Sequence, residues 1–491
     1  MQKHTIYVYR LYRMTAALIL SVPFIILSVS CRKFIEVEPP LTGLNGSNVY
    51  TTDATAAAVL TDIYAQMSAR NASLTDQSIT SIPLYVSLGA DELILYDLNA
   101  QNLAGYYRNE LHYGSHPSYW NAIYPQIYAS NSAIAGLNES TQLTPALKQQ
   151  LLGEAKFIRA FCYFYLVNMF GDVSLVLDLD YKANALLPRA PVAQVYEQII
   201  LDLKEAQELL SIDYLQGDAL TAYPSGSEER VRPTKWAATA LLARVYLYTG
   251  DNDNAATEAS KVIDHATLYN LGPLNQTFLK NNQEAIWQLQ PVRIEANPNS
   301  GEGRLFVLPP SGPNTIDHFV YLSPQVVNSF ETDDQRKTNW VDSVIVDGTT
   351  YYYPYKYKIG NVAAPMQEYP TILRLAEQYL IRAEARAAQN NIAGAQSDLN
   401  IIRSRAGLPN TTAADKTTLL HAILQERRVE LFTEWGHRWF DLKRTGQLDA
   451  VMQVVAPLKG SSWKPYQALY PIPQEDLNRD PNLVQNPGYN Q

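Results

Sequence analysis

The sequence predicts a mainly α-helical fold, in which tetratricopeptide-like helical pairs form a repeat scaffold beside a loop-rich region and a small β-hairpin. Apolar residues recur at steps of three and four along residues 373–387 and again along 395–406, so each set lies on one face of a helix. Residues 233–266 have the length of a tetratricopeptide unit, with a turn at Gly250. An Asp-Gly turn inside residues 340–357 predicts a hairpin.

The helical pair near residue 390 shows most directly why a scaffold is expected. Asn390-Asn391 separates the two periodic segments, and Gly407 followed by Pro409 ends the second one. Alanines on the facing sides allow the two backbones to lie close together. Because one such pair cannot bury its apolar face alone, further pairs are expected to stack on it.

The remaining elements follow from the same signals. Residues 71–117 and 271–367 largely lack helical periodicity, and the Pro- and Asn-rich tail from 469 to 491 is expected to be an irregular strap. Further helices are predicted at 51–70, 118–137, 145–170, 192–210, 323–330 and 417–435, with a strand at 284–290.

The helix expected at 417–435 carries charges on its apolar stripe. Because a buried charge without a partner is costly, these charges are expected to pair. A structural ion network is favoured over a catalytic acid and base, because no nucleophile or metal ligand accompanies them. The expected pairs join a carboxylate from Glu426, Glu430 or Glu434 to Arg427, Arg428 or Arg438.

The N-terminus has the pattern of an export signal. A basic start and an apolar run from 14 to 29 precede Ser30-Cys31, so residues 1–30 are predicted to be a lipoprotein signal peptide and Cys31 the lipidated first residue of the mature chain. An ordinary signal with a chance cysteine is the alternative, since Ser28 stands where an aliphatic residue is usual. Cys162 lies in an apolar helical run and is expected to be a buried hydrophobe.

Composition excludes two broad classes of protein. The chain has 491 residues, of which 46% are hydrophobic and 18% charged, as in a folded domain rather than a disordered chain. Its formal charge is −9, and loss of the leader cations Lys3, Arg10 and Arg13 brings the mature chain to about −12. An acidic surface argues against nucleic acid as a partner, because phosphates require a basic face.

Four strings in the C-terminal half carry a family resemblance. They read LRLAEQYLIRAEA, LNIIRSRAGL, ERRVELFTEWGHRWFDLKRTG and YPIPQEDLNRDPNLVQNPGY, in this order, the last ending at Tyr489. Together they closely resemble the RagB/SusD family of nutrient-binding outer-membrane lipoproteins.

The resemblance implies a SusD-like α-α superhelix built as one intertwined body, with an N-terminal region at 31–225 and a C-terminal region at 230–491. It further implies a lipid anchor in the outer membrane, an oligosaccharide ligand, no catalysis and no cofactor. The implied partner is a SusC-like TonB-dependent transporter barrel. Family members displayed on the cell surface often carry acidic residues after the cysteine, whereas Arg32-Lys33 follow here, so surface and periplasmic orientations both stay open.

Signatures of enzymes and metal sites are few. There is no nucleophile elbow, phosphate loop, dinucleotide fingerprint or zinc-binding helix in the sequence. His112 and His116 lie four residues apart in a loop-like stretch with no third ligand in view. The run 251–254 lacks the loop glycine and terminal glutamate of a calcium site and is better explained as a turn and helix cap. No metal is therefore predicted.

Tyrosine is the abundant side chain, with 33 copies against 12 Phe and 7 Trp. Its ring offers an apolar face and a hydroxyl edge, which suits the C–H faces and hydroxyls of a sugar. A second strand with Tyr353, Tyr355 and Tyr357 on one face is better explained by edge-strand packing than by ligand contact. The candidate ligand residues share one aromatic, polar loop, and a structural role is the alternative for each: Asp91, Tyr96, Asn99, Tyr106, Tyr107, Arg108 and Tyr113.

Three functions are compatible with these features. The first is a lid that captures glycans for a transporter, and the second is the same lid with a peptide ligand. The third is an exported all-α glycoside hydrolase, because paired carboxylates are brought together only by the fold.

Overall fold

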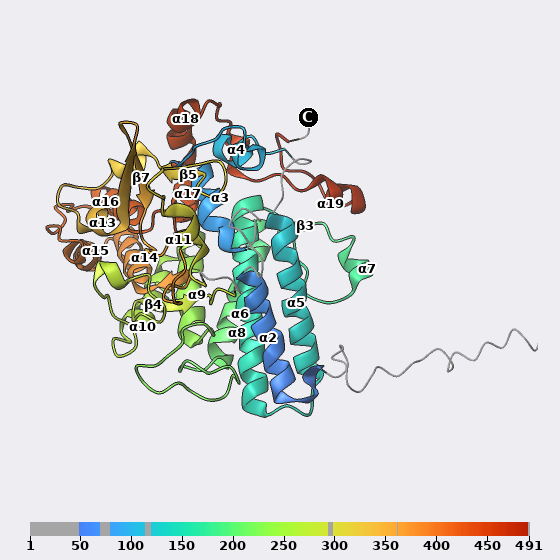
Figure 1. The fold of residues 1–491 in the computed structure, drawn as a ribbon. Coiled ribbons are helices and arrows are strands. Elements are labelled where there is room, and N and C mark those ends of the chain that lie inside the picture. The colour runs from blue at the N-terminus through green and yellow to red at the C-terminus, as the bar shows by residue number, and fades with distance from the viewer. Residues whose placement is uncertain (1–48, 69–78, 113–118, 293–297, 361, 490–491) are drawn as a thin grey trace, which may run out of the picture. The chain divides into compact units, whose positions relative to one another are not determined.

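A computed structural model describes residues 49–68, 79–112, 119–292, 298–360 and 362–489 (Figure 1). The predicted leader, Cys31, Tyr113 and His116 lie outside these ranges. Residues 50–491 form one structural unit, and the description below concerns that unit.

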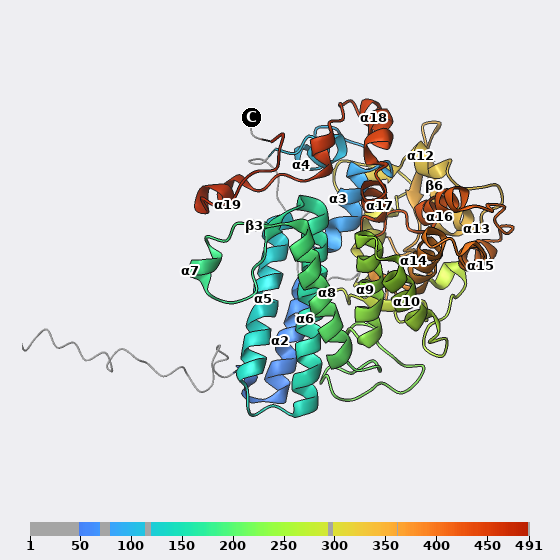
Figure 2. The same cartoon turned by 180° about the vertical axis from the view of Figure 1, so that it is seen from behind.

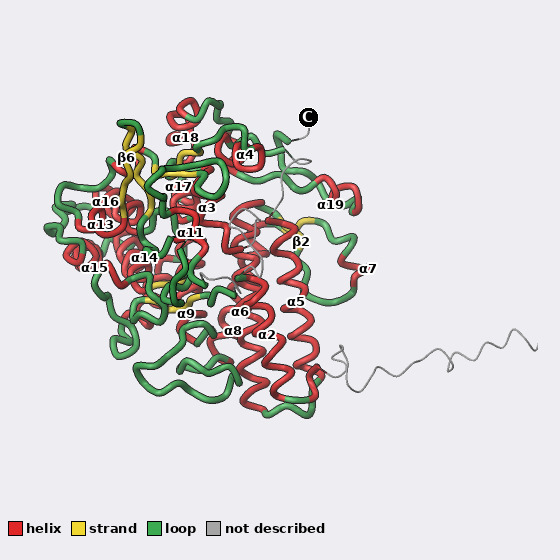
Figure 3. The backbone as a smooth tube through the Cα atoms, viewed as in Figure 1, coloured by secondary structure: helices red, strands yellow, loops and turns green. Residues whose placement is uncertain are grey.

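Helices dominate the described residues (Figure 3). They are α2 (Asp53–Met67), α3 (Ile82–Gly89), α4 (Gln101–Arg108), α5 (Tyr119–Glu139), α6 (Pro145–Phe170), α7 (Tyr181–Asn184), α8 (Val192–Leu209), α9 (Lys235–Thr249), α10 (Asn252–Ile263), α11 (Gly301–Phe306), α12 (Pro324–Val327), α13 (Gln335–Trp340), α14 (Leu375–Ala388), α15 (Ile392–Arg405), α16 (Lys416–Glu430), α17 (His437–Arg444), α18 (Leu448–Leu458) and α19 (Gln474–Arg479). Single 3-10 turns occur at Val49–Thr51, Ile79–Ser81, Leu274–Gln276 and Pro465–Ala468.

The long helices stack in chain order, as a repeat scaffold requires. α2 lies against α5 and α6, α6 against α8, α8 against α9, α9 against α10, and α10 against α14, which in turn contacts α15 and α16 (Figures 1 and 2). The predicted pairs α9–α10 and α14–α15 are confirmed. Asp251 caps α10 by accepting a hydrogen bond from Asn254 N at 3.2 Å, so the interpretation of 251–254 as a turn and cap is also confirmed.

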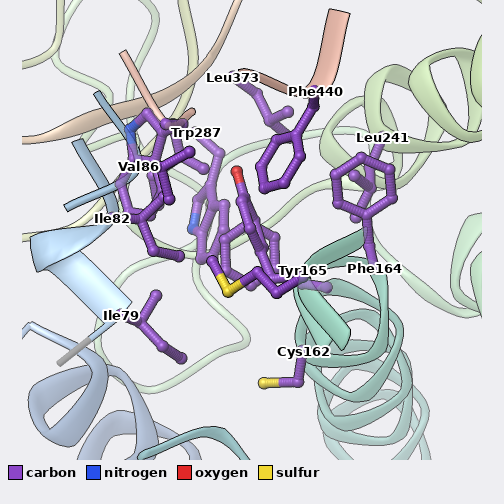
Figure 4. Packing of buried hydrophobic residues seen from close by; sticks show 14 of the residues in the cluster. Ile79, Ile82, Val86, Cys162, Phe164, Tyr165, Leu241, Trp287, Leu373 and Phe440 are labelled. Carbon is purple, nitrogen blue, oxygen red and sulfur yellow. The ribbon is translucent and has the colours of Figure 1, made fainter. Parts of the chain in front are cut away.

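The larger core includes the contact between α6 and the strand β4 (Ala285–Gln288). Trp287 is fully buried there, with ring centroids 4.9 Å from Phe157 and 5.3 Å from Phe161 in edge-to-face geometry. Figure 4 shows Tyr165 of α6 beside this indole, with Phe440 approaching from α17. Cys162 is 1% exposed, as predicted for a buried hydrophobe.

A smaller core joins α14, α15 and α16. Small side chains face one another across the first two helices, which allows the close approach expected from their alanines. Its fully buried members include Ala376, Leu380, Ala383, Ala387, Ala395, Leu399, Ile402, Leu419 and Ile423.

Within the described residues the strands form four antiparallel two-stranded pairs. β1 (Leu93–Leu95) pairs with β5 (Val320–Leu322), β2 (Val173–Ser174) with β3 (Arg189–Ala190), β4 (Ala285–Gln288) with β8 (Thr371–Arg374), and β6 (Val341–Val346) with β7 (Thr349–Pro354). The last pair is the predicted hairpin, turned at Asp347-Gly348, where both residues have positive φ.

Two predicted elements differ from the structure. The helix expected to reach residue 435 ends at Glu430, because Thr433, Trp435 and Gly436 adopt left-handed backbone angles. At Gly436 a Cβ would lie 2.8 Å from a Val86 methyl, so only glycine fits there. The region 71–117, predicted as loops, contains the helices α3 and α4, and the residues of α3 are all buried, so an apolar stripe could not reveal that helix.

The charges of α16 form a structural ion network, as predicted, but with other partners. Glu430 accepts from Arg336 at 3.0 Å and Arg374 at 2.7 Å, and Glu434 accepts from Arg374 at 2.8 Å. Arg427 donates to Asp441 at 2.7 Å. In the part of the chain that the structure describes, none of the six residues expected to pair does so with another of the six. The expected local pairs were therefore wrong.

Candidate functional site

Three tyrosines meet at one surface and define what we call the tyrosine cluster: Tyr96, Tyr321 and Tyr351. The Tyr351 ring stands edge-on to Tyr321, with centroids 5.1 Å apart, and to Tyr96 at 6.3 Å. Tyr96 is 45% exposed, while the other two are half-buried. Burial raises the pKa of Tyr321, and Tyr351 and Tyr96 raise it further. The cluster therefore presents one accessible ring, supported by two half-buried rings.

Pairing of distant strands builds the cluster. β1 and β5 are antiparallel, with Ile94 opposite Tyr321, and the amide of Tyr96 donates to Phe319 O at 2.7 Å just beyond the strand. β5 also lies against β7, which carries Tyr351. Segments more than 200 residues apart are thus fixed by backbone hydrogen bonds, which holds the rings on a rigid support.

Polar residues of the predicted loop lie on the same chain segment. Asn99 is exposed, and its backbone and side-chain amides donate to Asp97 at 2.9 and 3.1 Å. Arg108, at the last turn of α4, is half-buried, and its Nε meets no acceptor among the described residues. Such an unsatisfied buried donor is costly unless another group supplies the acceptor.

Other predicted ligand residues lie inside the protein. Asp91 is 3% exposed and accepts hydrogen bonds from Arg438 and Arg428. Burial would raise its pKa, but the bonds and charges of these two arginines hold that pKa below its ordinary value. Tyr106 is buried against Tyr85, with ring centroids 4.7 Å apart. Asp91 and Tyr106 are thus part of the frame that supports the site.

Tyr107 is also buried, yet it lies next to the cluster. Burial raises its pKa to about 12, and Tyr321 raises it too, so the two phenols are near each other. The ammonium of Lys459 lies 5.0 Å from the centroid of its ring. Tyr107 is therefore a buried residue near Tyr321 and not an exposed ligand residue.

Of the seven predicted residues, Tyr96, Asn99 and Arg108 keep accessible surface, and Tyr113 lies outside the described residues. Tyr321 and Tyr351 were not predicted. Strand alternation places Tyr351 on the same face as Tyr353, so the sequence pattern could have indicated Tyr351 as a candidate. No local sequence feature marks Tyr321 as a candidate.

The second strand was predicted to reach residue 357, but β7 ends at Pro354, so Tyr355 and Tyr357 lie beyond it and packing on an edge strand is confirmed for Tyr353 alone of the three. Tyr353 is buried and donates to Asp342 at 3.0 Å, and the Tyr357 hydroxyl accepts from Thr371 N at 2.9 Å. Tyr355 is half-buried.

The fold and the cluster together define a helical-repeat protein with an aromatic cluster at its surface. Two family models match the chain: the SusD family over residues 347–489, and a family described as "Starch-binding associating with outer membrane" over residues 33–247. The chain belongs to the SusD family, as its C-terminal strings predicted.

Relatives match along most of the chain. SusD-like protein P2 of Formosa agariphila is 28% identical, covering 92% of this chain and 96% of its own. The starch-binding protein SusD of Bacteroides thetaiotaomicron is 24% identical, covering 72% and 75%. The solved structure of surface glycan-binding protein A from Bacteroides uniformis superposes with a TM-score of 0.72 at 21% identity, covering 88% and 99%, which confirms the fold. None of the helices in the described ranges is long and apolar enough to cross a membrane.

Proposed function

We propose that this protein is a non-catalytic, glycan-binding lipoprotein of the outer membrane that binds an oligosaccharide at the tyrosine cluster and passes it to a TonB-dependent transporter. The single observation that carries the proposal is the meeting of Tyr96, Tyr321 and Tyr351 at one surface with an exposed ring. Membership of the SusD family supports the same class of ligand.

The chemistry of the cluster suits a sugar. A pyranose ring has C–H faces that stack on an aromatic ring and a rim of hydroxyls that need donors and acceptors. The three tyrosines supply the rings, and the exposed Asn99 lies on the adjoining segment.

The hydrogen bonds of Asp91 and Glu92, which directly precede β1, support binding without hydrolysis. Glycoside cleavage needs two carboxyl groups facing the scissile bond. Asp91 is held by two arginines, and Glu92 is buried, with an oxygen that accepts from Thr433 N at 3.0 Å. Both groups are therefore occupied in maintaining the fold.

Delivery follows from an anchored binding surface above a pore. A lipid on Cys31 would hold the protein at the membrane, and a lid carrying the ligand raises its concentration at the transporter mouth. Such a lid needs a large face for a SusC-like barrel and a small one for the ligand.

A binding screen separates the candidate functions. The mature chain is applied to a glycan array and, in parallel, to pools of short peptides, and any bound oligosaccharide is then analysed for cleavage products. Retention of a glycan that is recovered intact is expected. Binding of peptides alone would show that the ligand is a peptide and not a glycan. Release of shortened sugar would identify a hydrolase.

A further inference from the structure

Apart from the tyrosine cluster, the protein has a cleft of about 620 Å³ that shares no residue with that cluster. It opens between α2, the connection that runs from 215 to 232, and the end of β4. In Figure 1, β4 and α2 lie well below β5 and β7, so the two sites are separate. Its volume falls within the range of about 300–1,000 Å³ that is usual for pockets that bind small molecules.

Three tyrosines line this cleft: Tyr64, Tyr223 and Tyr369. Tyr369 is buried, and its hydroxyl donates to Glu229 at 3.3 Å. The hydroxyl of Tyr64 is fixed by Glu154 at 2.7 Å, while Tyr64 and Tyr223 are half-buried. The hydroxyls of Tyr64 and Tyr369 are thus held by carboxylates, and the tyrosines of the lining give the cleft apolar ring surface.

The charged groups of the cleft balance one another. Arg232 is fully engaged, since it donates to Glu154 at 2.7 Å, Thr61 at 2.8 Å and Gly217 O at 3.0 Å. Lys280 places its ammonium 5.8 Å from the ring centroid of Tyr369 and forms no ion pair within the described ranges. Lys280 and Glu229 thus remain as one donor and one acceptor of opposite charge, so the cleft favours an uncharged ligand that both donates and accepts hydrogen bonds.

We propose that this cleft is a second carbohydrate site, which takes a neutral di- or trisaccharide independently of the tyrosine cluster. Rings of Tyr64 and Tyr223 stack on the C–H faces of the sugar. The ammonium of Lys280 donates to one hydroxyl, and the carboxylate of Glu229 accepts from another. Two separate sites on one chain hold a long glycan at two points, which raises avidity without new contacts at either.

The test measures binding of neutral trisaccharides of glucose, mannose, xylose and galactose to the full mature chain by saturation-transfer NMR and calorimetry. Tyr223→Ala with Lys280→Ala removes a ring and a donor from the cleft. Tyr181→Ala with Lys182→Ala is the matched control, because Tyr181 is exposed and the Lys182 ammonium lies 5.9 Å from its ring on α7.

A second variant fills the cleft with a larger side chain. A Cβ at Gly217 would meet no atom within 4 Å, so Gly217→Trp fills open space in the cleft and removes no side chain. For at least one trisaccharide, both cleft variants are expected to weaken binding about tenfold or more, with an unchanged melting temperature. The control and Tyr96→Ala with Tyr351→Ala are expected to retain that binding event.

The opposite results overturn the second site. If every binding event is lost with Tyr96→Ala and Tyr351→Ala and survives both cleft variants, the tyrosine cluster binds sugar alone and the proposed function stands without the cleft. If no trisaccharide binds, or if the cleft variants weaken the binding of peptides but not of any trisaccharide, the cleft is not a carbohydrate site.

Discussion

Arg438 binds both carboxylate oxygens of Asp91, with Nε 2.7 Å from Oδ1 and Nη2 2.8 Å from Oδ2. Arg428 adds a third bond at 2.8 Å. Asp91 stands two residues before β1, so this bidentate pair ties α16 and α17 to the strand that leads to Tyr96. The ion pair is therefore part of the support of the tyrosine cluster.

Removing this carboxylate is expected to destabilise the protein. Asp91→Ala leaves the buried Arg438 and the half-buried Arg428 without their shared carboxylate, and breaking a buried pair costs about 3–5 kcal/mol. Urea unfolding followed by circular dichroism measures the loss. Asp213→Ala, at an exposed position, is the control and is expected to change the unfolding free energy by less than about 0.5 kcal/mol. A comparable effect of the two substitutions would contradict the supporting role of Asp91.

Loss of the exposed ring is expected to weaken glycan binding. Tyr96→Ala removes a stacking surface worth about 1 kcal/mol, or roughly a fivefold increase in Kd. Tyr96→Phe keeps the ring and is expected to retain most of the affinity. Calorimetry with a glycan identified on the array gives both values, and Tyr181→Ala is the matched control. An unchanged Kd for Tyr96→Ala would remove the cluster from the binding site.

A buried acid is expected to make stability depend on pH. Burial, aided by the charges of Glu434 and Glu368, raises the pKa of Glu302 from 4.5 to about 7, and the residue lines a cavity of about 10 Å³. A raised carboxyl pKa contributes stability that is complete below pH 4.5 and is lost as the pH rises through 7. Glu302→Gln mimics the protonated acid at every pH, so it removes this loss.

Comparing the wild type with Glu302→Gln isolates the contribution of the Glu302 carboxyl group to stability. At pH 4.5 or below, Glu302→Gln and the wild type are expected to unfold at the same urea concentration. At pH 8 the variant is expected to be more stable, by up to about 3 kcal/mol for a difference of about 2.5 pKa units. Glu475→Gln, on exposed α19, serves as the control. Equal stability of Glu302→Gln and wild type at pH 8 would show that Glu302 ionises without cost.

Replacement of the predicted lipidation site is expected to release the protein. Cys31→Ala removes the thiol that would carry the lipid, and the described helices offer no membrane span in its place. Cell fractionation and incorporation of labelled palmitate are the measurements. Cys162→Ala, at the buried cysteine, is the control and is expected to leave labelling unchanged. Labelling that persists in Cys31→Ala would place the anchor elsewhere.

Local signals were sufficient for the scaffold. α15 (Ile392–Arg405) begins after Asn390-Asn391 and ends before Gly407 as predicted, because its period, its start signal and its stop signal all lie within one short stretch. α3 was missed because it is apolar and buried on every side, so it has no polar face to mark its period.

Long-range contacts could not be predicted in the same way. The charges of Glu430 and Glu434 were recognised as a network, but their partners Arg336 and Arg374 come from α13 and β8, which only the fold brings near. Likewise the loop composition indicated Tyr96, while Tyr321 reaches it only through the β1–β5 pairing. The division into regions at 31–225 and 230–491 stays a prediction.

The three rings of the cluster come from differently related parts of the chain. Tyr96 and Tyr351 lie in the two stretches that family models match, whereas Tyr321 lies between residues 248 and 346, which neither model covers. A substitution at Tyr321 would therefore change one ring of the cluster without altering any residue in the two stretches that the family models match.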